Sequence, residues 1–180
     1  MEEKIKPRFL AYDSLNSMLE EHYIYQTSLG KLGKRVDLSI CVIEDFDFSG
    51  IDLSNIFAIG SIFNRCKFRN CDLYGTIFDE SKFIGADFSG ANLGKANFYQ
   101  VVAKNACFDN TNCAAEFDES NLSGSTFRNV NFGGASFVDC DLTDAIFDGA
   151  DLTDISTGGD NKLDNTSWFN IKGQRLLPRL

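Results

Sequence analysis

The chain has 180 residues, of which 43% are hydrophobic and 24% are charged, and its formal net charge is −9. This composition is typical of one globular domain and excludes a disordered or collagen-like chain. The acidic balance argues against direct nucleic-acid binding and against a basic membrane-surface protein. No apolar run approaches the roughly 18 residues of a transmembrane helix, so we expect no membrane association.

The first residues, MEEKIKPRF, lack the apolar core of a secretory signal peptide. We therefore expect a cytoplasmic protein. In that compartment the six cysteines remain reduced thiols, although six could form three disulfides in a secreted chain.

Residues 1–35 precede any regular repeat and are expected to form an N-terminal helical cap. The apolar spacing predicts a short amphipathic helix over residues 13–25, with Asp13 or Ser14 as its N-cap. Its inward face would carry Leu15, Met18, Leu19 and His22. We expect this helix to cover the exposed end of the structure that follows, and His22 to be a packing or surface residue.

Residues 36–154 carry a five-residue repeat with the pattern small–polar–Leu/Phe–polar–polar. Sixteen units are centred on positions 38 to 113 and eight on positions 117 to 152. One residue is missing near Ala114 and Ala115, where the phase slips. A period of five fits neither a 3.6-residue helix nor the strict alternation of a strand.

A chain that turns a corner every five residues accounts for this period, with the small and the large position of each unit pointing inward. Four units then form a coil of about 20 residues, and residues 20 apart stack at the ~4.8 Å strand spacing. The 20-residue register predicts one column made only of phenylalanine: Phe48, Phe68, Phe88, Phe108, Phe127 and Phe147.

Units such as CDLYG (71–75), ADFSG (86–90) and ADLTD (150–154) resemble the pentapeptide repeat family, whose idealised unit is A(D/N)LXX. The resemblance implies an all-β fold, a right-handed quadrilateral β-helix, and the repeat count implies about six coils. Some members of the family protect DNA gyrase and confer quinolone resistance.

The repeat dissolves after Leu152, and residues 155–180 form a tail that is too apolar for a free end. We expect this tail either to cap the last coil or to pair with a second subunit as a dimerisation element. The candidate residues for either role are Trp168, Phe169, Leu176, Leu177 and Leu180.

Motifs of enzymes are missing from the sequence, which has no GxSxG, no P-loop and no HExxH. Five of the six cysteines occupy inward positions of the repeat, where cysteine acts as a small apolar side chain. We therefore expect a protein that is not an enzyme, with no catalytic residue, no cofactor and no metal.

The charges concentrate on the repeat, because residues 36–160 hold 20 acidic and 7 basic side chains. The polar position before the central residue forms one continuous ladder: Asp52, Asp72, Asn92, Asn112, Asn131 and Asp151. Short Asx side chains at corners can bond to the backbone and aid solubility. Alternatively, a rigid acidic rod can imitate DNA and occupy a DNA-binding groove.

A second candidate surface is apolar and lies near the N-terminal coils. Its members fall where the repeat points to water: Val42, Phe57, Ile59, Ile62 and Ile77. An exposed apolar cluster usually marks a contact. Either the N-terminal segment folds back over it or a partner protein binds there.

Two functions follow. The first is a non-catalytic scaffold that presents a rigid acidic surface to a protein partner. The alternative, which the family resemblance implies, is a DNA-mimicking protein that binds gyrase or another topoisomerase.

Overall fold

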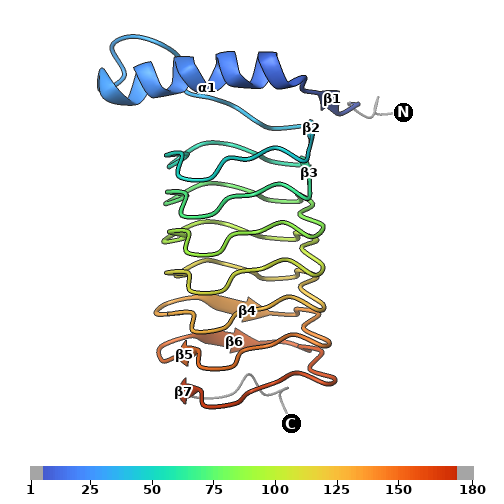
Figure 1. The fold of residues 1–180 in the computed structure, drawn as a ribbon. Helices are drawn as coiled ribbons and strands as arrows, with labels where there is room; N and C mark the ends of the chain where they lie inside the picture. Colours follow the sequence, from blue (N-terminus) through green and yellow to red (C-terminus); the bar gives the residue numbers. More distant parts are fainter. Residues whose placement is uncertain (1–5, 174–180) are drawn as a thin grey trace.

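The computed structural model describes residues 6–173, which form a β-helix solenoid with one α-helix across its N-terminal end (Figure 1). Most of each coil consists of turns and single bridges, so only a few stretches are long enough to count as strands. The elements are β1 (Arg8–Phe9), α1 (Tyr12–Thr27), β2 (Cys41–Glu44), β3 (Ile62–Asn64), β4 (Ser136–Val138), β5 (Asp151–Leu152), β6 (Ser156–Gly158) and β7 (Lys172–Gly173).

Parallel bridges join successive coils, and four columns of them run along the solenoid. Most partners are 20 residues apart, as in the pair Asp72 and Asn92. Across the predicted gap the separation falls to 19 residues, as in the pair Asn112 and Asn131. The 20-residue register and the missing residue near Ala114 are therefore confirmed.

The core is a stack of phenylalanine rings along the axis. In the predicted column, Phe68 and Phe88 have ring centroids 4.8 Å apart, and Phe88 and Phe108 are 4.9 Å apart at an interplanar angle of 2°. The column continues with the same parallel stacking through Phe127 to Phe147. Each of these rings is fully buried or nearly so, and the small residues of the repeat fill the space between them.

Pairing between coils continues beyond residue 154, where the repeat pattern ends. Strand β6 pairs with β4, and β7 pairs with β5. The separation between partners grows from 20 to 21 residues, as in the pair Asp141 and Lys162, so one extra residue lies in this coil. The solenoid thus extends one irregular coil further than the periodicity predicts.

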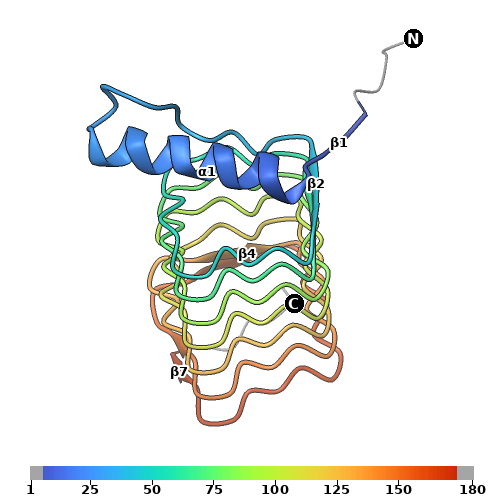
Figure 2. The ribbon, with the colours of Figure 1, turned by 45° about the horizontal axis from the view of Figure 1, so that its top comes forward.

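The N-terminal helix α1 crosses the open end of the first coil (Figures 1 and 2). Leu15, Leu19 and His22 are buried against that coil, as predicted. The start of the helix differs from the prediction, because it begins at Tyr12 with Ala11 as N-cap and no side-chain capping bond. Asp13 instead lies in the first turn, where a carboxylate is favoured by the helix dipole.

Candidate functional site

The predicted ladder is a continuous column in the structure. Parallel bridges connect each member to the next: Asp52, Asp72, Asn92, Asn112, Asn131 and Asp151. We call these six residues the Asx column. At its C-terminal end the column continues into Lys172, whose Nζ lies 3.6 Å from a carboxylate oxygen of Asp151.

Most side chains of the Asx column accept a hydrogen bond from the backbone N–H two residues later in the chain. The Asp52 carboxylate accepts a hydrogen bond from the N–H of Ser54 at 2.9 Å, and Asp151 accepts one from the N–H of Thr153 at 3.1 Å. Burial alone would raise the pKa of Asp52, but hydrogen bonds from Ser54 and Gln26 and the nearby His22 together lower that pKa. The column therefore has a structural role at corners, as Asx turns do.

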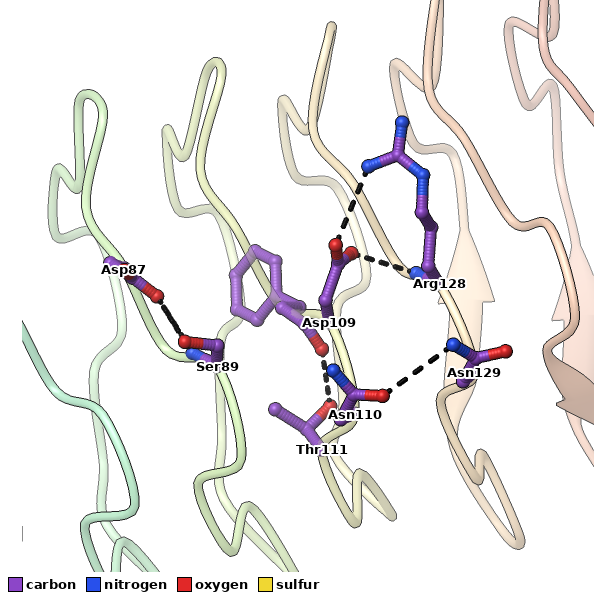
Figure 3. Close-up of polar contacts among 8 residues, drawn as sticks. Asp87, Ser89, Asp109, Asn110, Thr111, Arg128 and Asn129 are labelled. Carbon is purple, nitrogen blue, oxygen red and sulfur yellow. Dashed lines mark hydrogen bonds and ion pairs between the residues drawn. The ribbon is translucent and has the colours of Figure 1, made fainter.

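Neighbouring faces carry mixed charge, because basic side chains of one coil pair with acids of the adjacent coil. Figure 3 shows Arg128 beside Asp109, with 3.4 Å between the guanidinium and the carboxylate. Arg69 lies 2.5 Å from Asp87, whose carboxylate also accepts a bond from Ser89. The two guanidinium groups are about half-exposed, and each pair contributes at most about 1 kcal/mol. Because each pair joins opposite charges, the face that carries Arg69 and Arg128 has less net negative charge than a face with acidic side chains alone.

A second acidic group was not predicted from the sequence. It spans three successive coils, with Asp79 and Glu80 on the first, Tyr99 on the second, and Glu116, Asp118 and Glu119 on the third; we call these five acidic residues the acidic cluster. None of the five forms an ion pair within residues 6–173. The signal was present in the sequence, since positions 79, 99 and 118 stack in the same 20-residue register.

Crowding perturbs two carboxylates of the acidic cluster. Burial, and then the nearby Glu80, raise the pKa of Asp79, and its Oδ1 has no hydrogen-bond partner among the described residues. Burial also raises the pKa of Glu116, with Asp118 and Asp79 adding to the effect. Glu119 is held in place by bonds from the Tyr99 hydroxyl at 3.0 Å and the Gln100 amide at 2.7 Å. The cluster is thus a site of uncompensated negative charge.

Replacement of Asp79 by Asn is expected to stabilise the fold at pH 7. The pKa of Asp79 is higher in the folded state, so its ionised form opposes folding, and this penalty disappears as the pH falls through the folded-state pKa. The gain is within about 1 kcal/mol after solvent screening, and it vanishes below about pH 3.9. Urea unfolding of the native protein and the variant, at pH 7 and again below about pH 3.9, measures this gain in stability. Asp154→Asn, on an exposed corner, is the control and should change stability by less than about 0.5 kcal/mol.

The apolar patch predicted near the N-terminal coils is only partly exposed. Val42 is buried, because β1 of the N-terminal segment pairs with β2 and covers it, which is the first of the two expected alternatives for this position. Phe57 and Ile77 are bridge partners, as their spacing indicates, but both are half-buried. The Arg35 guanidinium covers the Phe57 ring at 4.9 Å from its centroid. Ile59 and Ile62 are likewise half-buried.

Two of the predicted tail residues lie on the last coil. Trp168 extends the phenylalanine column, with its ring stacked 4.6 Å from that of Phe147, whereas Phe169 is 77% exposed. Leu176, Leu177 and Leu180 lie outside the described residues.

The cysteines have the environment of core residues. Cys66, Cys71, Cys113 and Cys140 are buried, and burial raises the pKa of Cys66 to about 11 and that of Cys71 to about 12. Such thiols are poor nucleophiles. Within residues 6–173, no group of three or more His, Cys, Asp or Glu side chains could hold a metal ion. No helix in this range is long and apolar enough to cross a membrane.

Three solved structures illustrate what the fold resembles. A trypsin-treated form of QnrB1, a plasmid-mediated fluoroquinolone resistance protein, is 20% identical, with 77% of this chain and 72% of that chain covered and a TM-score of 0.54. A pentapeptide repeat protein from the Arabidopsis thaliana thylakoid lumen is 27% identical, with 66% of each chain covered and a TM-score of 0.35. HetL, involved in heterocyst differentiation regulation in Nostoc sp. strain PCC 7120, is 19% identical, with 77% and 81% covered and a TM-score of 0.28.

No curated protein matches the chain significantly. Two family models do match it. The pentapeptide repeat region model covers residues 76–157, and the model of eight pentapeptide repeats covers residues 47–83. Together with the bridges between residues 20 apart and the stacked core, these matches show that the chain belongs to the pentapeptide repeat family.

Proposed function

We propose that this protein is a non-catalytic scaffold whose rigid acidic surface binds a basic surface of another protein. The observation that carries the proposal is the charge of the solenoid, since residues 36–160 have 20 acidic and 7 basic side chains. The core uses the inward residues of every unit, so the outward residues are free to serve binding. Opposite charges would steer and orient such a partner.

The acidic cluster is the proposed centre of this surface. Its carboxylates lie on the two coils that flank the coil of Tyr99, and burial together with neighbouring acids raises the pKa of Asp79 and of Glu116. A basic partner would relieve this repulsion, so binding should be stronger here than at the mixed-charge face near Arg69 and Arg128.

Affinity capture from the native host, followed by mass spectrometry, tests the proposal. The test variant carries Glu80→Gln, Glu116→Gln and Glu119→Gln. A matched control removes three exposed charges elsewhere on the solenoid by changing Asp144, Asp154 and Asp164 to Asn. We expect one captured protein to be lost with the test variant and kept with the control. Equal capture by the native protein, the test variant and the control would contradict the proposal. Turnover of a substrate that depends on one side chain would contradict it as well.

A second candidate is a DNA mimic that occupies the DNA-binding groove of gyrase or another topoisomerase. The net charge per length of the solenoid favours this candidate. Residues 36–160 have a net charge of −13, and six coils at ~4.8 Å spacing extend about 29 Å. The solenoid therefore carries roughly one net negative charge per 2.2 Å, against one per ≈ 1.7 Å of B-DNA. In this case the protein would bind the topoisomerase itself and would not bind nucleic acid.

Inhibition or protection of gyrase supercoiling tests the second candidate. The native protein should act in low salt, and the variant with Asp52, Asp72 and Asp151 changed to Asn should act more weakly with an unchanged melting temperature. Gyrase that is indifferent to the native protein in low salt would exclude a DNA mimic that binds gyrase and leave the scaffold proposal intact.

For the architecture we propose a right-handed, four-sided solenoid of about six coils over residues 36–154. Residues 1–35 serve as its N-terminal helical cap, and residues 155–180 supply the irregular last coil and a C-terminal cap or dimerisation element. Four columns of parallel bridges support the four-sided section. A crystal structure with a left-handed or three-sided coil would contradict it. We also propose a cytoplasmic location, which fractionation of the native host tests.

A further inference from the structure

A groove of about 1060 Å³ separates α1 from the first coil. Its apolar lining comes from Leu19, Tyr23 and Ile24 of the helix and from Ile51 of the coil. Tyr23 is 68% exposed and Ile24 is 41% exposed, so this lining faces solvent. The volume is at the upper end of the ~300–1,000 Å³ range of ligand pockets and can hold several residues of a peptide.

The charged side chains that line the groove are acidic. Glu20 and Asp52 lie on its two sides, and no Lys or Arg is among the described residues that line it. His22 also lines the groove and is 1% exposed. Its Nδ1 accepts a bond from the N–H of Val36 at 3.3 Å, and its buried Nε2 lies beside the backbone of Asp52. The groove therefore fits an apolar segment with positive charge.

The chain itself contains such a segment. Residues 174–180 read QRLLPRL, which is three leucines and two arginines without an acidic residue. This composition complements a groove lined by apolar and acidic side chains.

This segment cannot fill the groove of its own copy. Asp52 and Lys172 belong to the same bridge column and are six steps apart, or about 29 Å at the ~4.8 Å strand spacing. Figure 1 accordingly shows β7 at the end of the solenoid opposite α1. Seven fully extended residues span at most about 25 Å. An occupant with this sequence must come from a second molecule.

We propose that residues 174–180 of one copy dock in the α1 groove of another copy, so that copies associate head to tail. The leucines contact Tyr23, Ile24 and Ile51, and the arginines pair with Glu20 and Asp52. Such a contact is heterologous and leaves a free groove at one end and a free segment at the other. Assembly therefore grows with concentration and does not stop at a dimer.

Sedimentation velocity of the full chain over a range of concentrations tests this proposal. The groove variant is Ile24→Arg, and the segment variant carries Leu176→Glu and Leu177→Glu. Ile84→Arg is the matched control, because Ile84 is 39% exposed and lies outside the groove. We expect the native chain and the control to exceed twice the 20.0 kDa monomer mass at high concentration, and each variant to stay a monomer.

A mixture of the two variants gives the sharpest result. A head-to-tail contact predicts that the intact segment of the groove variant binds the intact groove of the segment variant, and that assembly stops at a dimer of twice the 20.0 kDa mass. A native chain that stays monomeric at every concentration overturns the proposal. So does assembly that survives in either variant, or a mixture that stays monomeric.

Discussion

Replacing Phe88 with Ala is expected to lower the free energy of unfolding by about 3–5 kcal/mol. Phe88 is fully buried in the middle of the phenylalanine column, with parallel rings 4.8 Å away in Phe68 and 4.9 Å away in Phe108. The neighbouring coils are held by bridges on every side, so the cavity cannot collapse easily. Chemical denaturation of both proteins measures the difference.

Ile84→Ala is the control for this prediction. Ile84 belongs to the same coil but is 39% exposed, so its loss should cost less than about 1 kcal/mol. Equal effects at the two positions would mean that position 88 is not in a stacked core and that the 20-residue register is incorrect.

Replacing Leu15 with Asp is expected to detach α1 from the first coil. Leu15 is fully buried against the core, so the change removes apolar contact and buries a charge, at a cost above about 3 kcal/mol. The effect should be local, since each coil of a solenoid contacts only its neighbours. Hydrogen exchange should show loss of protection in α1 and the first coil, with protection kept around Phe108.

Ser14→Asp is the matched control for the helix, because it places the same charge on an exposed position one residue away. It should leave the protection of α1 unchanged. Cooperative loss of protection along the entire solenoid in Leu15→Asp would contradict the interpretation of α1 as a local cap.

The periodic part of the fold could be predicted in detail because inward residues obey strict packing limits. The phenylalanine column and the missing residue near Ala114 both follow from the spacing of Leu and Phe, and both are present in the structure. The last coil could not be predicted in this way. Thr157, Trp168 and Gly173 occupy its central positions in place of Leu or Phe, and one extra residue shifts its phase.

The candidate sites were harder to predict, since outward residues follow no rule of the repeat. The Asx column could be predicted from the sequence because every position in this one column is Asp or Asn. The acidic cluster combines residues from adjacent columns around Tyr99, so inspection of single columns missed it. The burial of Val42 depends on β1, a strand of two residues with no pattern of its own.

The salt dependence of binding to a captured partner decides whether the acidic surface of the solenoid is the binding surface. We expect affinity to fall steeply as ionic strength rises, and the variant with Glu80, Glu116 and Glu119 changed to Gln to bind more weakly with a shallower dependence on salt. An affinity that is independent of salt and equal in the two proteins would mean that the partner binds elsewhere.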